Sequence, residues 1–415
     1  MYRAPRGTAD ILPVEQPYWR CVEQKAAAIC QLYGYERIDT PTFEDTQLFA
    51  RGIGDATDIV RKEMYSFSGG ELTLRPEGTA PVCRAYIQHG MHSWPQPVKL
   101  YYIASLFRHE RPQAGRYRQH HQFGYEAIGS ADAALDGEVI DVAWQFYQSL
   151  GLRDLSLQLN SIGCRKCRPE YLAALRAYYE PVTGLCRDCV TRRTTNPLRL
   201  LDCKNESCQQ VADAAPKSTD QLCPECATHF GKLKGHLAVL GIPFEVNHRL
   251  VRGLDYYTRT VFEFQPAEGG AQSAIGGGGR YDDLIEVLGG RPTPGIGFAT
   301  GIERIVLNLK KQGIPVPALS HPPVFIAGIG DAARDEAVKL AARLRRSGIG
   351  VIEAVGGRSL KAQLRQANSL GARYTVIIGE EELAGDNAVL RDMSGARQET
   401  VPLGQLPQKL QKMVS

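Results

Sequence analysis

Residues 107–126 read FRHERPQAGRYRQHHQFGYE and form the most informative stretch of the chain. Alternating arms at 100–108 and 119–127 flank a turn that contains proline and glycine, and this pattern predicts a β-hairpin. The hairpin tip carries four arginines: Arg108, Arg111, Arg116 and Arg118. Planar, permanently charged guanidinium groups suit phosphate oxygens. The spacing alone therefore indicates either an anion-binding site or a solvated basic hairpin.

The second arm of the hairpin carries polar residues with a period of two. Gln122, Gly124 and Glu126 lie on one face of the predicted strand. A carboxylate and an amide on one face of a sheet can hold a polar substrate, and cross-strand pairing with nearby arginines is the alternative.

Three further blocks combine glycine with arginine. They read LVRGLDYYTRTVFE at 250–263, GGGGRYD at 276–282 and GIGFATGIER at 295–304. Glycine lets a backbone approach a ligand closely or adopt positive φ. One such block more often marks a turn or a bulge, and three of them in one domain strengthen the case for a binding site. Their spacing argues against both a Walker loop and a Rossmann fingerprint.

The overall composition is that of a globular protein. The chain has 415 residues, of which 43% are hydrophobic, and a net charge of +4, which disfavours disordered, collagen-like and coiled-coil classes. At about 100 to 200 residues per domain, the length predicts two or three domains. With no apolar run of about 18 residues and no signal-peptide core, we expect a soluble cytoplasmic protein without a membrane partner.

The pattern of elements divides the chain into three parts. A helix followed by short alternating segments predicts an α+β domain, built on an antiparallel sheet and made of residues 1–160 and 233–320. A cysteine-rich and arginine-rich insertion, 161–232, interrupts this domain. After a proline-rich linker, βαβ units predict a small α/β domain over 321–415.

Eight of the 11 cysteines lie in the insertion. They are Cys164, Cys167, Cys186, Cys189, Cys203, Cys208, Cys223 and Cys226. The first four form two CxxC pairs with a separation typical of zinc ribbons, and the last four repeat the arrangement more loosely. The cysteine pattern has two interpretations: either two tetrahedral structural zinc sites, or eight reduced thiols. A catalytic zinc is disfavoured, because four sulfur ligands leave no open position.

Together these blocks resemble the histidyl-tRNA synthetase family of class II aminoacyl-tRNA synthetases. The segments and the motifs that they resemble are Thr40-Pro41 with Phe43 (class II motif 1), 107–126 (motif 2), 295–304 (motif 3), and 250–263 and 276–284 (two histidine signatures). The resemblance also takes in residues 75–80, and the C-terminal part is similar to the family's anticodon-binding domain. It implies a class II catalytic core with an inserted cysteine-rich subdomain.

The resemblance implies a histidine–tRNA ligase. ATP, with Mg²⁺, would activate L-histidine to histidyl-adenylate and pyrophosphate, and histidine would pass to the 3′ end of tRNA(His). It also implies a homodimer, with Pro41 near the interface. The family does not require Zn²⁺, so the resemblance leaves both interpretations of the cysteines open.

The resemblance further implies a role for individual residues, since this reaction needs charge neutralisation and alignment of phosphates. The catalytic arginines would be Arg108 and Arg252, where Arg252 takes a position that other class II enzymes give to a metal ion. The residues implied for ATP binding are Arg108, Glu110, Arg116, His120 and Arg304. Those implied for histidine binding are Glu77, Gly78, Thr79, Gln122, Glu126, Tyr256 and Tyr257. Gln113 and Arg118 would contact the tRNA acceptor end.

One residue departs from the family pattern, and one rival function competes with the proposed one. His120 stands where we expect a phenylalanine that stacks on adenine, which puts ATP affinity in question. The rival is a regulatory subunit of ATP phosphoribosyltransferase, which resembles the synthetase core and binds histidine as an effector. That class normally lacks the C-terminal domain and the intact block around Arg252, and this sequence has both.

Overall fold

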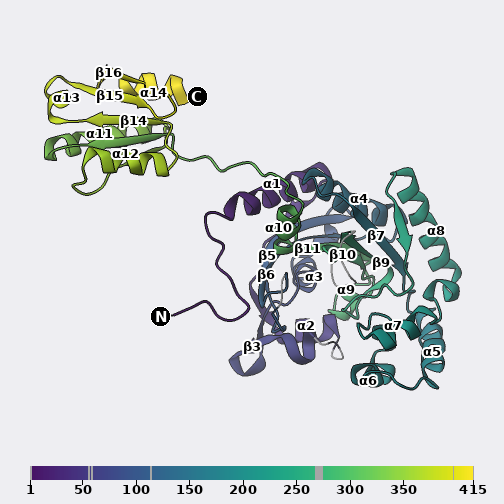
Figure 1. The fold of residues 1–415 in the computed structure, drawn as a ribbon. Coiled ribbons are helices and arrows are strands. Elements are labelled where there is room, and N and C mark those ends of the chain that lie inside the picture. The colour runs from purple at the N-terminus through teal and green to yellow at the C-terminus, as the bar shows by residue number, and fades with distance from the viewer. Residues whose placement is uncertain are drawn as a thin grey trace. The chain divides into compact units, whose positions relative to one another are not determined.

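The computed structural model describes residues 2–54, 57, 59–112, 115–266, 274–395 and 397–414. The chain forms two units, one up to Pro317 and the other from Ala318 (Figure 1). In the described part of the chain, no helix combines the length and the apolar character needed to cross a membrane.

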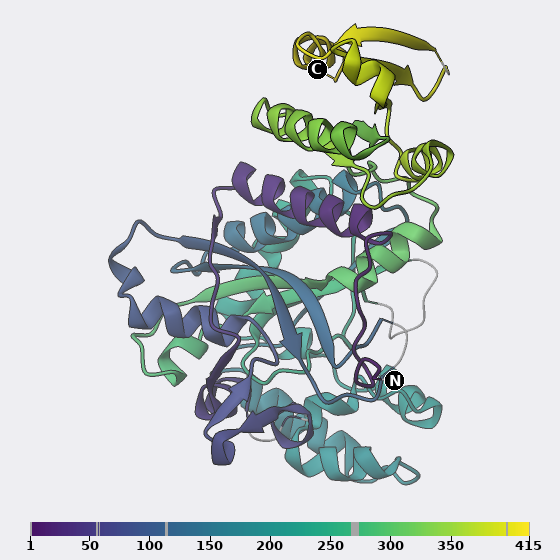
Figure 2. The same ribbon diagram turned by 90° about the vertical axis from the view of Figure 1, so that its left-hand side faces the viewer.

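An eight-stranded sheet forms the centre of the first unit, and Figure 2 shows it from a second direction. Its strands, in spatial order, are β1 (Glu36–Arg37), β5 (Val98–Phe107), β6 (Gln119–Ile128), β11 (Gly295–Gly301), β10 (Gly276–Arg280), β9 (Thr258–Pro266), β7 (Leu155–Ser161) and β8 (Phe244–Val246). The six strands from β5 to β7 are antiparallel, which confirms the predicted core. Both outer pairs, β1–β5 and β7–β8, are parallel, because each is joined by a long crossover connection.

The predicted hairpin is confirmed, within two residues at each end. Strands β5 and β6 pair from Val98 opposite Ile128 to Phe107 opposite Gln119. Every residue of β6 from Phe123 onward is buried, because both faces of the sheet are covered there. The covered faces explain why this arm is more apolar than an exposed hairpin would be.

Helices cover the two faces of the sheet. On one face they are α1 (Gln16–Leu32), α4 (Ala133–Ser149) and α10 (Ile302–Lys311), and on the other α2 (Thr46–Ile53), α3 (Thr79–Gln88) and α9 (Leu284–Val287). The first group packs against the rings of Phe123 and Tyr125, and the second against Leu100 and Tyr102. The second face is the one that carries Gln122, Gly124 and Glu126, because side chains alternate along β6.

Several shorter elements complete the first unit. A small sheet has the order β2 (Phe43–Asp45), β4 (Leu72–Leu74) and β3 (Tyr65–Phe67). Single helical turns lie at Ile59–Glu63, Ser68–Gly70, Met91–Ser93, Pro197–Leu200 and Ser218–Gln221.

Strand β10 consists of four glycines and an arginine, and it runs through the centre of the sheet. A Cβ on Gly278 would collide with the backbone carbonyl of Gly297 on β11. A Cβ on Gly277 would lie 2.9 Å from a guanidinium nitrogen of Arg252, and one on Gly279 would lie 2.9 Å from the ring of Tyr257. These glycines therefore make room both for the neighbouring strand and for functional side chains above the sheet.

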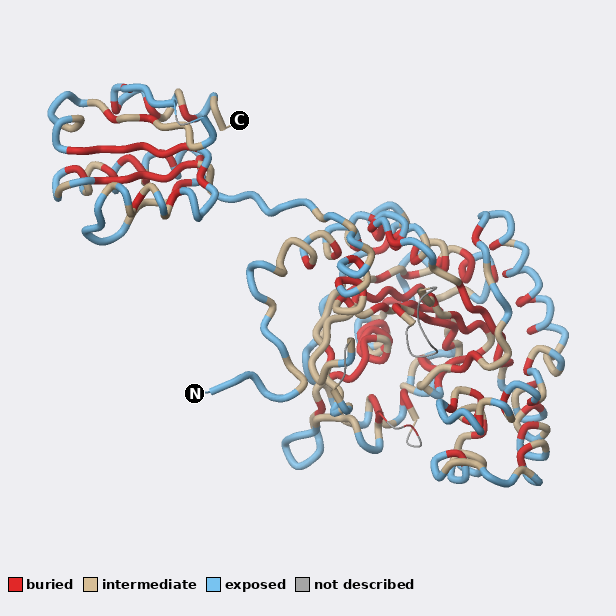
Figure 3. The backbone as a smooth tube through the Cα atoms, viewed as in Figure 1, coloured by how far each residue is buried: buried red, intermediate tan, exposed pale blue. Residues whose placement is uncertain are grey.

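The insertion between β7 and β8 is mostly helical. Its helices are α5 (Arg168–Tyr179), α6 (Arg187–Thr195), α7 (Glu206–Asp213) and α8 (Pro224–Val239). Helix α8 continues past residue 232, where the sequence pattern placed the end of the insertion. Phe230, Leu233 and Leu237 of α8 join the first core of the central sheet. Figure 3 shows the buried side of α8 as red segments that alternate with exposed ones.

The second unit is a small α/β fold. Its sheet has the order β13 (Val351–Glu353), β12 (Val324–Gly328), β14 (Tyr374–Ile378), β15 (Asn387–Asp392) and β16 (Gln398–Pro402). Its helices are α11 (Asp331–Arg346), α12 (Leu360–Ser369), α13 (Glu380–Ala384) and α14 (Leu406–Val414). The parallel strands β13, β12 and β14 confirm the predicted βαβ units. The antiparallel β15–β16 hairpin and α14 were not predicted from the sequence.

Candidate active site

A cavity of about 770 Å³ lies on the second face of the sheet. The hairpin, the 250–263 block, the glycine strand, the 295–304 block and the insertion all contribute to its wall. The predicted site residues that line it are Arg108, Glu110, Arg116, His120, Gln122, Arg252 and Arg304. The fold thus brings together segments separated by nearly 200 residues, as the sequence interpretation requires.

Arginines and one carboxylate form one side of this cavity. The carboxylate of Glu110 lies 3.8 Å from Nη1 of Arg108 and 3.6 Å from Nη1 of Arg116. Nε of Arg108 donates to the carbonyl of Pro76 at 2.7 Å, which fixes the direction of its guanidinium group. Two arginines share one carboxylate, so the cluster keeps a positive charge that suits a polyanion.

Arg304 approaches the same side from α10. Its Nε donates to the carbonyl of Gly115 at 3.1 Å, and Nη1 donates to the carbonyl of Ala274. Burial and the nearby charge of Arg116 lower the pKa of Arg304. The guanidinium is still cationic at neutral pH, because arginine titrates far above it.

Arg252 lies against Glu263 and Tyr257 in the cavity wall. It forms an ion pair with Glu263, and its guanidinium carbon lies 5.9 Å from the centre of the Tyr257 ring. Burial is the largest single influence on the pKa of Arg252 and lowers it, but the charges and hydrogen bonds of Glu263 and Tyr257 together outweigh burial, so the pKa is raised. Among the described residues, the buried Nε of Arg252 has no hydrogen-bond partner. A buried donor without a partner at a cavity indicates a ligand contact.

Glu126 does not line the cavity itself. It lies on the same face of β6 as the cavity residue Gln122, with an exposed fraction of 1%, and we call its buried surroundings the floor of the site. It accepts hydrogen bonds from the hydroxyls of Thr79, at 2.8 Å, and Tyr281, at 2.7 Å. Burial raises the pKa of Glu126 to about 8, and the nearby charge of Glu77 adds to this effect. A carboxyl group held in this way is poised to pair with a weakly basic group of a substrate.

Glu77 and Thr79 connect this floor to α3. The carboxylate of Glu77 accepts from the backbone N–H groups of Thr79, at 2.7 Å, and Ala80, at 2.8 Å, and thus caps the helix. The hydroxyl of Tyr256 lies 3.4 Å from the same carboxylate. Burial raises the pKa of Glu77 despite these bonds. Glu77 therefore has a structural contact besides its predicted contact with substrate.

The ring of Tyr102 fills the space between Gly78 and Gly124. A Cβ on either glycine would collide with that ring. The Tyr102 hydroxyl lies 3.5 Å from the side-chain oxygen of Gln122. Gly78, which was predicted to bind histidine, thus leaves room for the tyrosine.

His120 lies half-buried in the cavity wall. Burial, followed by the positive charges of Arg108, His121 and Arg304, lowers the pKa of His120 to about 3. Its ring is therefore neutral at physiological pH and offers a flat aromatic face.

The two residues predicted to contact tRNA differ in what the structure shows. Arg118 is half-buried, and its Nε lies 3.3 Å from the carbonyl of Glu110 at the base of the tip. Gln113 lies outside the described residues.

The cysteines of the insertion form two groups of four whose sulfur atoms lie within 4.8 Å of one another. The groups are Cys164, Cys167, Cys223 and Cys226, and Cys186, Cys189, Cys203 and Cys208. The grouping by sequence order, which placed the two CxxC pairs of Cys164 and Cys186 together, is wrong. Folding nests the second group inside the first, because α8 returns to the start of the insertion.

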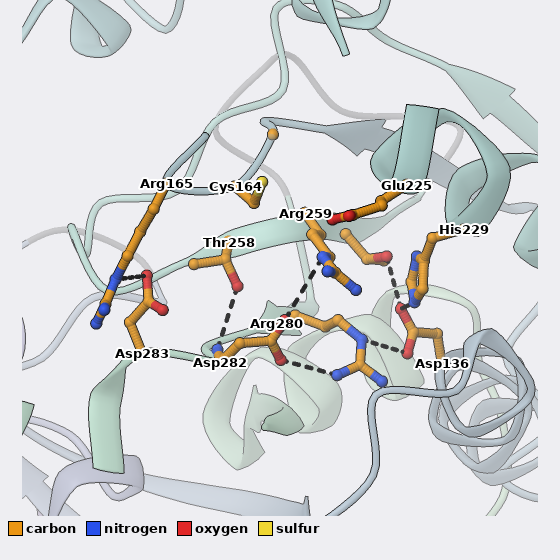
Figure 4. Close-up of polar contacts among 12 residues, drawn as sticks. Asp136, Cys164, Arg165, Glu225, His229, Thr258, Arg259, Arg280, Asp282 and Asp283 are labelled. Atoms are coloured by element: carbon orange, nitrogen blue, oxygen red, sulfur yellow. Dashed lines mark hydrogen bonds and ion pairs between the residues drawn. The ribbon is translucent and has the colours of Figure 1, made fainter. Parts of the chain in front are cut away.

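Arg280 does not line the site, although its glycine block favoured a ligand contact. Its buried guanidinium donates to Asp136 at 2.7 Å and to Asp282 at 2.8 Å (Figure 4). Thr260 donates to Asp136 at 2.6 Å, and His229 lies 3.5 Å from it. Burial raises the pKa of Asp136 to about 6, against the opposing charge of Arg280. This network holds α4, β9 and β10 together.

Sequence reasoning gave no role to three residues that shape the site. Tyr281 and Glu263 lie inside recognised blocks and orient Glu126 and Arg252. Tyr102 lies on β5 outside any block. The only available signal was that a lone carboxylate or arginine in a cavity needs a partner.

Comparisons with known proteins agree with this geometry. The family model described as histidyl-tRNA synthetase matches residues 7–167 and 181–305, and the one described as anticodon binding domain matches 323–413. Histidine–tRNA ligases from Dehalococcoides mccartyi and Desulforamulus reducens are 62% and 51% identical, covering 100% and 97% of both chains. The crystal structure of apo Staphylococcus aureus histidyl-tRNA synthetase is 40% identical, with a TM-score of 0.82 over 99% of each chain. The chain belongs to the histidyl-tRNA synthetase family of class II aminoacyl-tRNA synthetases.

Proposed function

We propose that this protein is a histidine–tRNA ligase that forms histidyl-adenylate from L-histidine and ATP and then charges tRNA(His). The observation that carries the proposal is Arg252, a half-buried cation in a cavity lined by further arginines, whose buried Nε has no hydrogen-bond partner in the part of the chain that the structure describes. The relatives named histidine–tRNA ligase cover the full chain, which supports the same function.

In this proposal ATP lies along the arginine side of the cavity. Arg108 and Arg252 contact the α-phosphate and stabilise the charge that develops when the histidine carboxylate attacks phosphorus. Arg116 meets the outer phosphates, Glu110 lies beside the base or ribose, and Arg304 and His120 stack on adenine. Release of pyrophosphate then follows without a proton-transfer residue.

Mg²⁺ enters this proposal with ATP. Of the residues that the structure describes, six carboxylates line the cavity, and two of them, Glu110 and Glu263, are each engaged by arginine. The ion would bind chiefly through the phosphates of ATP, as Mg²⁺ usually does at nucleotide sites. It neutralises phosphate charge, while the arginines of the chain orient the nucleotide.

Histidine selectivity comes from the buried floor. The imidazole pairs with Glu126, beside Tyr257, and the α-amino group lies near Glu77, Thr79 and Gln122. A buried carboxyl group without its partner is costly, so amino acids that lack a ring N–H are rejected strongly.

The proposal extends to the rest of the assembly. Residues 321–415 bind the anticodon, the catalytic domain is formed by 1–160 and 233–320, and the insertion 161–232 contacts the acceptor arm together with Gln113 and Arg118. The protein acts in the cytoplasm as a homodimer. Structural Zn²⁺ occupies the insertion, since two groups of four cysteines offer the ligands that this ion prefers.

Aminoacylation of purified tRNA(His) with labelled histidine tests the proposal. The full-length protein should charge tRNA(His) and leave tRNAs for other amino acids uncharged. Binding of histidine without any charging would favour the regulatory-subunit alternative. The C-terminal unit argues against that alternative, because it matches the anticodon-binding family.

A further inference from the structure

The two cysteine groups differ in their place in the fold. The base group, Cys164, Cys167, Cys223 and Cys226, lies where the insertion leaves and rejoins the central sheet. Cys164 follows β7 within three residues, and Cys223 directly precedes α8. The wall group consists of Cys186, Cys189, Cys203 and Cys208. Cys186 and Cys203 of this group line the substrate cavity itself.

The sulfur positions fit a single tetrahedral ion in each group. Sγ of Cys164 lies 3.9 Å from both Cys167 and Cys223, and Sγ of Cys186 lies 3.8 Å from Cys203. A tetrahedron with zinc–sulfur bonds of about 2.3 Å has edges of roughly 3.8 Å. A disulfide would need a separation of about 2.05 Å. The geometry therefore favours a mononuclear Cys₄ centre over paired cysteines.

The backbone around both groups favours thiolates. Cys167, Cys186 and Cys223 occupy the N-cap positions of α5, α6 and α8, where the helix dipole stabilises negative charge. The backbone N–H of Cys164 donates to the sulfur of Cys167, and that of Cys186 to the sulfur of Cys208, both at 3.3 Å. Donors to sulfur accompany thiolate–metal centres because they offset the charge of the ligands.

Charged side chains also surround the wall group. Zn²⁺ with four thiolates carries a net charge of −2, after four thiol protons are released to solvent. The cavity wall next to this group contains three cations, Arg192, Arg199 and Lys204, and two carboxylates, Asp188 and Asp202, and Asp202 pairs with Arg199 at 3.1 Å. The small excess of positive charge in this wall would offset part of the charge of the centre.

The wall group connects directly to the block that holds the catalytic arginine. Between Cys189 and Cys203, Asn196 donates to Asp255 at 2.8 Å. Nε of Arg249 donates to the carbonyl of Leu201 at 3.3 Å. Both contacts join the segment between the cysteines to residues that flank Arg252, so fixing the cysteines also fixes one support of that block.

We infer that each group binds one Zn²⁺ and that the wall centre makes histidine activation dependent on zinc, because it holds the cavity wall against the Arg252 block. The base centre holds the two ends of the insertion together and acts on stability. The dependence on zinc rests on the proposed function, whereas the two metal sites do not.

Metal content of the full-length wild-type protein, measured by elemental analysis after gel filtration, tests the sites directly. We expect two zinc ions per chain, and Co²⁺ in their place should give the intense sulfur-to-cobalt absorption of tetrathiolate sites. Cys203→Ser and Cys223→Ser should each lose one ion. Cys21→Ser, outside the insertion, is the matched control and should keep both.

Histidine-dependent pyrophosphate exchange then tests the coupling. Cys203→Ser should lower kcat/KM about 10- to 100-fold, the cost of misplacing groups at a reacting centre. Cys223→Ser should lower the thermal midpoint while the folded fraction keeps most of its activity. Asn196→Ala keeps every cysteine, so it should retain two zinc ions and still lose part of the exchange activity.

The metal sites, their coupling to histidine activation and the proposed function are each contradicted by a different result. A wild-type protein with less than one metal ion per chain, and no tetrathiolate spectrum with cobalt, rejects the sites. Loss of one zinc in Cys203→Ser with unchanged exchange rejects the coupling. Two zinc ions in a wild-type protein without any histidine-dependent exchange would leave the sites standing and reject the proposed function.

Discussion

Replacement of Glu126 by glutamine should stabilise the protein at alkaline pH while it impairs histidine activation. The pKa of Glu126 is about 8 in the folded chain, mainly because of burial, whereas 4.5 is its ordinary value. Between these two values the unfolded chain has lost the proton and the folded chain still holds it. Stability therefore falls as pH rises through this window, and it stays at its lower level above pH 8.

The magnitude follows from the same two values. At about 1.4 kcal/mol per pH unit, the full window corresponds to about 5 kcal/mol. Glutamine removes this pH-dependent penalty, but its amide must face the hydroxyls of Thr79 and Tyr281, which costs about 1–3 kcal/mol at any pH. The cost of the glutamine amide is the same at pH 5.5 and at pH 8.5, so it cancels when the two pH values are compared. The stability difference between variant and wild type should then change by about 3 kcal/mol in favour of the variant.

Urea unfolding followed by tryptophan fluorescence measures this difference. All three tryptophans, Trp19, Trp94 and Trp144, lie in the first unit, so the signal reports on the unit that contains Glu126. The same variant should lose about 2- to 13-fold in kcat/KM for histidine at neutral pH, as expected for a hydrogen bond to a neutral carboxyl group worth about 0.5–1.5 kcal/mol. A stability difference that stays constant with pH would refute the reasoning about burial.

Three further changes and one control have defined outcomes. Arg252→Ala should lower pyrophosphate exchange by about 10²- to 10³-fold with an unchanged circular dichroism spectrum, because it removes a fixed positive charge at the developing phosphate charge. Arg280→Met should lower the unfolding free energy by about 3–5 kcal/mol in urea titrations, since Asp136 stays buried with the hydrogen bond from Thr260 but loses its ion pair with Arg280. Arg37→Met, in an exposed ion pair, is the control and should cost less than about 1 kcal/mol. His120→Phe should lower the KM for ATP roughly fivefold in exchange assays, since a larger aromatic face adds about 1 kcal/mol of stacking.

Local patterns predicted the parts of the fold that depend on local contacts. The hairpin of β5 and β6 and the βαβ units of the second unit follow from side-chain periodicity and from proline and glycine at their turns. Of the four arginines predicted at the hairpin tip, Arg108 and Arg116 line the cavity, whereas Arg111 and Arg118 do not.

Contacts between distant segments could not be predicted in the same way. Arg280 and Asp136 are 144 residues apart, and nothing in the glycine block shows that its arginine is buried rather than free to bind a ligand. Glu126 and Tyr281, 155 residues apart, are a similar pair. The cysteine groups depend on where α8 returns to the sheet, which sequence order does not reveal. These features follow from the tertiary fold, which brings together residues whose separation in sequence is arbitrary.

Histidine-dependent exchange of labelled pyrophosphate into ATP tests the central claim most directly. The account predicts exchange with histidine, none with the other amino acids, and loss of exchange in the Arg252→Ala protein. Retention of histidine binding without exchange in the wild-type protein would contradict it, since the arginine cavity would then not be a site of adenylate formation.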